Sequence, residues 1–316
     1  MTGRVLVTGA SGFVGRALVA HLVAGGVPVR GAVRRRPGAL PRGVDIVEVG
    51  DIGGATDWSA ALAGIDTVVH CAARVHQLSD ASTDPLAAFR EVNREGTLAL
   101  GRAAARSGAS RLVFLSSIGV NGAETFGRAF CAEDAPAPCS AYAISKREGE
   151  DGLRAIGREA GLKIVVVRAP LVYGPGAPGN FAALLRAVKR GFPLPLGAIA
   201  NQRSLVSIYN LVDLIRNCTR HDRAAGQTLL VSDGEDLSTT DLLRRTAKAF
   251  GVRPRLLPVP TSWLRLATDI AGRPEIGQRL CGSLQIDISA TRERLAWSPP
   301  MSVDEALAAT ARGHAI

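Results

Sequence analysis

The chain has few aromatic residues and few lysines. Aromatic side chains make up 4% of its 316 residues, and lysine occurs only at positions 146, 163, 189 and 248. Proteins that bind single-stranded nucleic acids need aromatic platforms on which bases stack. The net charge of +10 comes from scattered arginines and not from one basic tract. We therefore expect no nucleic-acid partner, and instead a small substrate or cofactor that carries phosphate groups.

Paired cysteine motifs and long apolar runs are also missing. No two cysteines form a C-x-x-C pair, and none has histidines at metal-ligand spacing, which predicts free thiols in a reducing compartment and no metal site. No apolar run approaches the ~18 residues of a membrane span. The first residues pass directly into a short strand, without the pattern of a signal peptide. We expect a cytoplasmic protein with no membrane insertion.

Short apolar runs alternate with helical patterns through the first two thirds of the chain. This alternation predicts βαβ units and a parallel, doubly wound sheet of the Rossmann type, an α/β fold. The predicted strands are Val5–Thr8, Val29–Val33, Val44–Val49, Thr67–Cys71, Leu112–Ser116, Ile164–Val167 and, returning to the sheet, Thr228–Val231. The predicted helices between them are Phe13–Val23, Trp58–Leu62, Phe89–Arg106 and Tyr142–Ala160.

The composition of the sequence changes after Pro175: proline and glycine become frequent, and helical patterns become short. We expect residues 1–174, with about 211–232, to form a dinucleotide-binding domain. Residues 175–210 and 233–316 would form a smaller, mixed α/β lobe that covers the carboxyl ends of the strands and binds substrate.

A glycine-rich turn joins the first predicted strand to the first predicted helix. Gly9, Gly12 and Gly15 are spaced G-x-x-G-x-x-G within Gly9-Ala10-Ser11-Gly12-Phe13-Val14-Gly15. Glycine permits a tight turn and a close approach of the backbone to pyrophosphate, while the helix N-terminus supplies N–H groups for the anion. The strand–turn–helix context predicts a dinucleotide site, because a glycine triple alone also occurs in ordinary loops.

Two arginines follow the second predicted strand. NAD-preferring sites usually place an acidic residue there for the ribose 2′-hydroxyl, whereas arginine accommodates a 2′-phosphate. Val33 occupies the acidic position, and Arg34 and Arg35 follow it. The sequence favours NADP(H) with NAD(H) possible, although a solvated basic turn would look the same. Asp51 could reach the adenine amine or simply cap the next helix.

Tyr142 and Lys146 are four residues apart on a predicted helix, so their side chains project from one face. A nearby ammonium favours the phenolate, so we expect Lys146 to lower the Tyr142 pKa. Such a tyrosine exchanges a proton with an alcohol oxygen while hydride moves at the adjacent carbon. This spacing also occurs by chance on solvated helices. It indicates a catalytic pair here because the chain also contains the glycine turn of a dinucleotide site.

Further candidates lie near the same edge of the predicted sheet. Ser116 and Ser117 end the fifth strand and face opposite ways, so we assign Ser117 to the reacting oxygen and Ser116 to packing. Asn93 is a candidate for organising the lysine and a proton-relay water. His70 and His76 have no aspartate partner or metal spacing and are weak acid–base candidates.

Taken together, these motifs resemble the extended short-chain dehydrogenase/reductase family, in the branch that acts on nucleotide sugars. The resemblance covers nearly the whole chain. The motifs that carry it are Thr8–Gly15, Gly50-Asp51-Ile52, His70-Cys71-Ala72-Ala73, Asn93 with Gly96-Thr97, Ser116-Ser117, Tyr142 with Lys146, and Arg168–Pro175.

The resemblance implies roles for further residues and a homodimer formed through two helices per subunit. Ser117, Tyr142 and Lys146 would be catalytic, with Asn93 supporting them. The implied cofactor-binding residues are Gly9, Ser11, Gly12, Phe13, Val14, Gly15, Arg34, Arg35, Asp51, Ile52, Cys71, Ala72, Ala73, Asn93, Tyr142, Lys146 and Pro170. The implied substrate-binding residues are Ser117, Asn180, Leu194, Leu196, Arg203 and Arg279.

Departures from the family's patterns narrow the reaction. Ser117 is followed by Ile118-Gly119, so the Asp-Glu pair of nucleotide-sugar 4,6-dehydratases is absent. Leu171 replaces an asparagine that many 4-epimerases carry, and Val75 replaces a lysine that some of them carry. The chain looks similar to reductases of UDP-4-keto-6-deoxy-N-acetylhexosamines, a subgroup often labelled as epimerases. A UDP-sugar 4-epimerase with retained NAD, and a non-catalytic NADP-binding regulator, stay open as alternatives.

Overall fold

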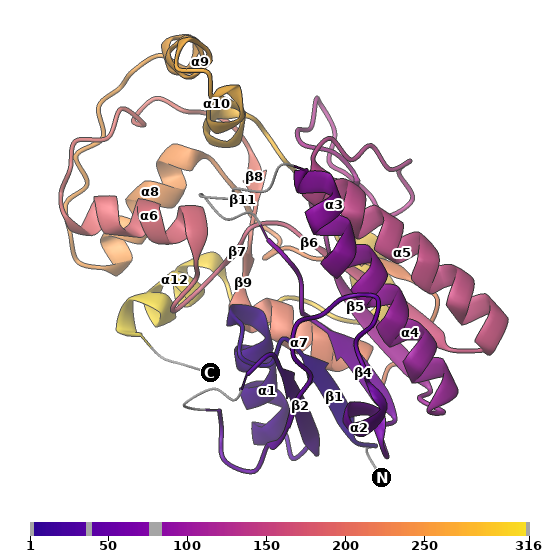
Figure 1. The fold of residues 1–316 in the computed structure, drawn as a ribbon. Helices are drawn as coiled ribbons and strands as arrows, with labels where there is room; N and C mark the ends of the chain where they lie inside the picture. Colours follow the sequence, from indigo (N-terminus) through magenta and orange to yellow (C-terminus); the bar gives the residue numbers. More distant parts are fainter. Residues whose placement is uncertain (1–2, 36–39, 76–83, 314–316) are drawn as a thin grey trace.

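A parallel seven-stranded sheet forms the centre of the computed structural model, which describes residues 3–35, 40–75 and 84–313 (Figure 1). The strand order is β10-β6-β5-β4-β1-β2-β3. The strands are β1 (Val5–Thr8), β2 (Val29–Val33), β3 (Asp45–Glu48), β4 (Thr67–His70), β5 (Arg111–Ser117), β6 (Lys163–Ala169) and β10 (Thr228–Leu230). This order confirms the predicted doubly wound sheet, including the late return of its seventh strand.

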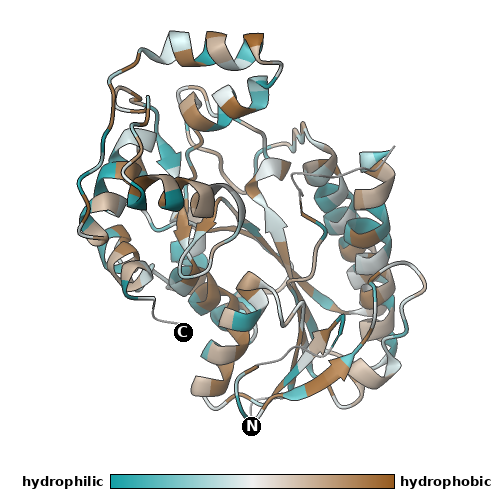
Figure 2. Cartoon of the chain, turned by 60° about the vertical axis from the view of Figure 1, so that its left-hand side comes forward, coloured by the Kyte–Doolittle hydropathy of each residue, from teal (hydrophilic) through white to brown (hydrophobic). Residues whose placement is uncertain are grey.

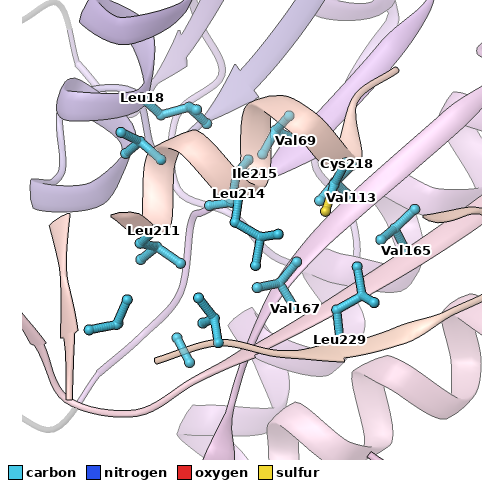
Figure 3. Packing of buried hydrophobic residues seen from close by; sticks show 14 of the residues in the cluster. Leu18, Val69, Val113, Val165, Val167, Leu211, Leu214, Ile215, Cys218 and Leu229 are labelled. Atoms are coloured by element: carbon cyan, nitrogen blue, oxygen red, sulfur yellow. The ribbon is translucent and has the colours of Figure 1, made fainter. Parts of the chain in front are cut away.

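Helices cover both faces of the sheet because each strand alternates its side chains between two apolar layers. On one face, Val69, Val113 and Val167 pack against α1 (Phe13–Ala24) and α7 (Ile208–Cys218) (Figure 3). On the other face, Val68 and Leu112 join a second buried cluster. The helices of that face are α2 (Ser59–Leu62), α3 (Pro85–Arg90), α4 (Thr97–Arg106) and α5 (Ala141–Ala160).

The predicted helix over residues 89–106 is wrong as one continuous element. The helical stretch begins at Pro85, after Asp84 caps the backbone N–H of Ala87, and it changes at Glu91–Gly96 into a π-helical turn (η1). Helix α4 resumes at Thr97. Such single π-turns occur frequently at functional sites, and this one contains Asn93.

The part of the chain that follows β6 adds short elements above the strand ends (Figure 1). Two small sheets pair β7 (Val172–Tyr173) with β9 (Val206–Ser207) and β8 (Arg203–Ser204) with β11 (Asp236–Leu237). The helices are α6 (Gly179–Lys189), α8 (Thr239–Ala249), α9 (Thr261–Ile270), α10 (Pro274–Cys281), α11 (Ser289–Leu295) and α12 (Val303–Arg312). Single 3-10 turns are η2 (Ile118–Val120) and η3 (Asp222–Ala224).

The strand order reverses between β1 and β4, and ligands bind α/β sheets at the carboxyl ends of the strands beside such a switch point. Thr8 and His70, the last residues of the two strands, are paired in register. The predicted glycine turn and the His70–Ala73 segment therefore lie at the same edge of the sheet.

Candidate active site

The glycine turn lies against the segment that follows β4. Gly9 has a positive φ of 64°, and a Cβ on it would lie 2.9 Å from the Cα of Ala72. The Ala72 backbone N–H donates to the Thr8 hydroxyl at 3.3 Å, and that hydroxyl also bonds His70 Nδ1 at 2.6 Å. These contacts bring the predicted cofactor residues of the two segments together.

The beginning of α1 is shaped for an anion. A Cβ on Gly15 would overlap the carbonyl oxygen of Gly9, so only glycine lets the helix approach the turn this closely. Gly12 is the N-cap, and no side chain of the described residues caps this helix end. Its backbone N–H groups and the positive end of the helix dipole suit a diphosphate. The cradle therefore fits a dinucleotide.

The end of β2 carries a charged pair. Arg34 Nε lies 3.2 Å from Asp51 Oδ1, and both side chains are mostly exposed. Arg35 is exposed as well, while Val33 is buried at the strand end. The two residues proposed for opposite parts of an adenosine are thus neighbours. Ile52, the residue after Asp51, is partly buried and packs against the sheet's second apolar cluster.

Helix α5 carries Tyr142 and Lys146 past the ends of β4 and β5. Ser140 caps the helix by accepting a hydrogen bond from the Ala143 N–H at 3.2 Å. Lys146 is 1% exposed, and its Nζ lies 4.0 Å from the centre of the Phe114 ring, a cation–π contact. Tyr142 is half-buried, with its ring edge-on to Phe89 at 6.0 Å between ring centres.

Ser117 comes within reach of the same helix. A Cβ on Gly119 would touch both the Ser117 hydroxyl, at 3.3 Å, and the Ala143 side chain, at 3.4 Å. The Ser117 hydroxyl accepts the Gly119 N–H at 3.1 Å, while Ser116 is buried on the other side of the strand. The two serines therefore face opposite ways.

The expected fall of the Tyr142 pKa is wrong, because the Tyr142 pKa is raised. Burial raises the pKa of Tyr142 to about 12, because the phenolate loses solvation. The pKa of Lys146 falls to about 7, again chiefly through burial, although Glu150 and Cys71 act to raise it. Burial also raises the pKa of Cys71 to about 12, against the effect of Lys146, which places this thiol beside the lysine.

The direct hydrogen bonds of Asn93 go to Arg74 and Ser145, beside the site. Its side-chain Nδ2 donates to the Arg74 carbonyl and to the Ser145 hydroxyl, both at 3.0 Å. Its Oδ1 accepts the Arg74 N–H at 2.8 Å, and Ser145 donates to the Tyr142 carbonyl at 2.8 Å. Asn93 therefore joins the π-turn, the segment after β4 and the first turn of α5.

His70 serves a structural role. It is 1% exposed, stacks on Phe114 and bonds the hydroxyls of Thr8 and Thr97 through its two ring nitrogens. Burial and the neighbouring Lys146 lower its pKa to about 3, so it is neutral at physiological pH. His76 lies outside the described residues.

The predicted substrate residues lie in two groups. Arg203 is largely buried and donates to the Gly282 carbonyl at 2.9 Å, and the charges of Glu124 and Arg279 both act on it. The Arg203 pKa is lowered, with burial as the main cause. Leu194 pairs with Leu256, and Leu196 is buried in the apolar cluster beside it. Asn180 is the second residue of α6, but its side chain lies outside the described part.

The sequence model of the "NAD dependent epimerase/dehydratase family" matches residues 5–231. The chain belongs to this family. A UDP-glucose 4-epimerase of Vibrio cholerae is 44% identical over 319 aligned positions, covering 99% of this chain and 95% of the relative.

Solved structures of the epimerase/dehydratase type share the fold. A Thermotoga maritima UDP-glucose 4-epimerase with UDP-glucose is 23% identical, with a TM-score of 0.79 and 98% coverage of both chains. A Thermus thermophilus UDP-glucose 4-epimerase in complex with NAD is 26% identical, with a TM-score of 0.78 and 98% coverage of both chains.

In this epimerase/dehydratase chain, the sequence did not predict the buried ion pair of Glu150 and Arg168 beside the site. Glu150 lies four residues after Lys146 on α5, the same spacing that singled out Tyr142 and Lys146. Its carboxylate accepts hydrogen bonds from Ser116 at 2.5 Å and from Arg168 at 2.6 and 3.0 Å. The spacing was the available signal, but the pairing with β6 depends on the fold.

Proposed function

We propose that this enzyme is an oxidoreductase that acts at carbon 4 of a UDP-linked sugar. The narrower proposal is reduction of a UDP-4-keto-6-deoxy-N-acetylhexosamine to its 4-hydroxy form. The observation that supports it is geometric: Tyr142 shares α5 with the buried Lys146, one turn away, and both the Ser117 hydroxyl and the Ala143 side chain of α5 border Gly119. Burial raises the Tyr142 pKa to about 12, so the phenol retains its proton at physiological pH. A protonated phenol is the form that a carbonyl reduction needs.

Tyr142 and Ser117 have different roles at the 4-keto group of the sugar. A bound reduced nicotinamide cofactor would supply the hydride. Tyr142 donates its phenolic proton to the sugar oxygen as negative charge develops there. Ser117 accepts the Gly119 N–H, and its hydroxyl can still donate its own hydrogen to a second acceptor, for which the same sugar oxygen is suited. Two donors on one oxygen stabilise its developing charge.

Lys146 supplies positive charge close to the reaction. With a pKa of about 7, a substantial fraction of it is charged at neutral pH. An ammonium ion stabilises the tyrosinate left after proton transfer, and its N–H groups suit the hydroxyls of a ribose. Asn93 keeps Tyr142 in position through Ser145, whose hydroxyl donates to the Tyr142 carbonyl.

Arginines of the carboxyl-terminal part suit the diphosphate of the substrate. Arg203 is fixed by the Gly282 carbonyl and lies close enough to Arg279 for the two charges to interact. Guanidinium groups bind phosphate oxygens through paired N–H donors. We assign substrate binding to residues 175–210 and 233–316, with Asn180, Leu194 and Leu196 as further contacts, and the cofactor to residues 1–174 with 211–232.

Arg34 and Arg35 support a preference for NADPH over NADH. Both are exposed beyond the end of β2, where an adenosine 2′-phosphate would meet them. Arg34 already faces the Asp51 carboxylate, so a 2′-phosphate would compete with that carboxylate for the guanidinium. We further propose that the enzyme is a cytoplasmic homodimer. Among the described residues, no helix is long and apolar enough to cross a membrane.

A UDP-sugar 4-epimerase that retains NAD is the second candidate. The relative named UDP-glucose 4-epimerase, 44% identical over nearly the whole chain, favours it. The same Tyr142, Ser117 and Lys146 would serve an oxidation followed by a reduction at carbon 4. A non-catalytic NADP-binding regulator is a third candidate, but such a protein has no need for both Tyr142 and Lys146.

A coupled assay separates the candidates. UDP-N-acetylglucosamine, a 4,6-dehydratase and NADPH are supplied, and the absorbance of reduced nicotinamide is followed with and without the protein. The reductase consumes NADPH only when both dehydratase and protein are present, and Tyr142→Phe lowers the rate of that consumption by about 100-fold or more. Absence of this consumption overturns the reductase. Interconversion of UDP-glucose and UDP-galactose without added cofactor establishes the epimerase.

A further inference from the structure

Helix α9 presents large apolar side chains to solvent. Trp263, Leu266 and Ile270 are 69%, 58% and 80% exposed. They occur at positions i, i+3 and i+7, a spacing that places them on one face of a helix. Figure 2 shows this helix at the outer end of the molecule, opposite the N-terminus, with hydrophobic residues along it. We name these three residues the α9 stripe.

The orientation of α9 reverses the usual rule for surface helices, whose apolar face packs inward. The inward side of α9 carries Arg265, which pairs with Glu124 at 3.1 Å, and Thr268, which lies against Gly277 of α10. Leu264 is the side chain that reaches the apolar cluster of the lobe. The helix is therefore held by the face that carries Leu264, Arg265 and Thr268, and the α9 stripe faces solvent. An exposed apolar patch of a few hundred Å² is often functional.

The size of the α9 stripe argues against a second copy of the chain as its occupant. Three side chains of this size offer on the order of 400 Å². A stable protein–protein interface needs about 800 Å² from each partner. A lipid surface imposes no such minimum, because a short amphipathic helix binds the headgroup boundary with one tryptophan and a few aliphatic side chains.

The charge of the chain is complementary to an anionic bilayer. The whole protein carries a net charge of +10. Residues 251–281, which include α9 and α10, contain five arginines and two carboxylates. Of these arginines, Arg265 is paired with Glu124 and Arg279 is assigned to the substrate. Arg273 is exposed in the turn directly after α9, whereas Asp269 on the helix itself opposes the attraction. Basic residues near an apolar helix face strengthen binding to anionic lipids.

We propose that the α9 stripe docks this enzyme on the surface of an anionic lipid bilayer without spanning it. Helix α10 packs beside α9 and carries Arg279, one of the two arginines assigned to the substrate diphosphate. Docking would therefore place the substrate-binding lobe next to the membrane. The proposal goes beyond the function proposed above, and its test uses no turnover, so the two stand or fall separately.

The tryptophans of the chain give a direct test on the full-length protein. Trp58 and Trp297 are 1% and 5% exposed, whereas Trp263 is 69% exposed, so Trp263 is the tryptophan that a lipid can reach. Vesicles of phosphatidylcholine, with and without phosphatidylglycerol, are added and the emission is recorded. We expect a blue shift with the anionic vesicles, quenching by brominated lipid, and weakening of both by added salt.

Variants locate the contact. Leu266→Ser with Ile270→Ser retains the Trp263 reporter and should lower vesicle binding, measured by co-sedimentation, at least tenfold. Phe192→Ser removes an exposed apolar side chain from the turn after α6 and should leave binding unchanged. Circular dichroism checks that each variant is folded.

Two results would overturn the proposal. One is wild-type emission that does not respond to anionic vesicles. The other is a blue shift of Trp263 that grows with protein concentration without lipid, together with self-association in sedimentation velocity, which would assign the α9 stripe to a second copy of the chain.

Discussion

Glu150 and Arg168 form a bidentate ion pair in the interior, next to the proposed catalytic residues. Glu150 lies one helical turn after Lys146 on α5 and bonds Ser116, the neighbour of Ser117. Arg168 Nη2 lies 2.6 Å from Glu150 Oε2, and Arg168 Nε lies 3.0 Å from Glu150 Oε1. The Arg168 and Glu150 side chains are 2% and 0% exposed, respectively. Ser116 and Asn121 complete the hydrogen bonding of the pair at 2.5 and 2.9 Å. The pair thus ties α5 to β6, to the end of β5 and to the turn beyond it.

Removing the charge of Glu150 should destabilise the fold strongly. Glu150→Gln leaves the buried Arg168 guanidinium without its counter-ion, which costs about 3–5 kcal/mol in the free energy of unfolding. Glu148→Gln is the matched control on the same helix, because its pair with Arg90 is partly exposed and solvent weakens the attraction between the two charges. Urea unfolding measures both variants. Equal losses in the free energy of unfolding would mean that the buried pair stabilises the fold no more than the exposed pair does.

Tyr142→Phe should lower kcat by about 100- to 10,000-fold, because the proton donor of the reduction is lost. The affinity for the cofactor, measured by fluorescence titration, should change little, since the ring and its contact with Phe89 are retained. Tyr209→Phe, on α7, is the control and should keep full activity. A variant that binds the cofactor and retains wild-type kcat would remove Tyr142 from the mechanism.

Arg34→Ala with Arg35→Ala should change the cofactor preference. The double variant loses the charges proposed to meet the 2′-phosphate, so we expect the Kd for NADPH to rise about tenfold or more, at about 1.4 kcal/mol per factor of ten. The Kd for NADH should stay within about twofold, well inside that 1.4 kcal/mol. Arg106→Ala, at the exposed end of α4, controls for the general loss of positive charge. A parallel rise of both Kd values would contradict a role in discrimination.

Gly15→Ala should abolish dinucleotide binding. The added methyl group would overlap the Gly9 carbonyl oxygen, so the turn and the start of α1 must move apart. Gly54→Ala is a matched control, because its Cβ would make an ordinary contact of 3.5 Å with the Glu95 side chain. Calorimetric titration with NADPH measures binding. Retained affinity in Gly15→Ala would show that the close approach is not needed for the cofactor.

The stability of the protein should rise with pH between about 7 and 10.5 through Lys146. Its pKa is about 7 in the folded protein and 10.5 in the unfolded chain. In that window the unfolded chain holds the proton and the folded protein does not, so raising the pH favours folding. Urea unfolding across this range should give a flatter dependence for Lys146→Met. The exposed Lys163→Met should leave the slope unchanged. An unchanged slope in Lys146→Met would contradict the shift.

Local patterns were sufficient for the sheet and for the glycine turn. Apolar runs such as Val5–Thr8 and Thr67–His70 predict buried parallel strands because both their faces are covered. The glycine at position 15 could also be predicted, because any side chain there would overlap the Gly9 carbonyl oxygen. The break in the helix at Asn93 could not, because no residue near it signals a π-turn.

The amino-acid sequence by itself determined the order of strands and helices and which side chains reach the switch point, because alternation, helical spacing and glycine turns are local properties. Tertiary structure decided the chemistry of those side chains. Tyr142 is protonated and Lys146 is close to half-charged at neutral pH because segments distant in the chain bury them. The partner of Glu150 and the outward face of α9 were decided in the same way, since desolvation and pairing depend on which elements meet in space.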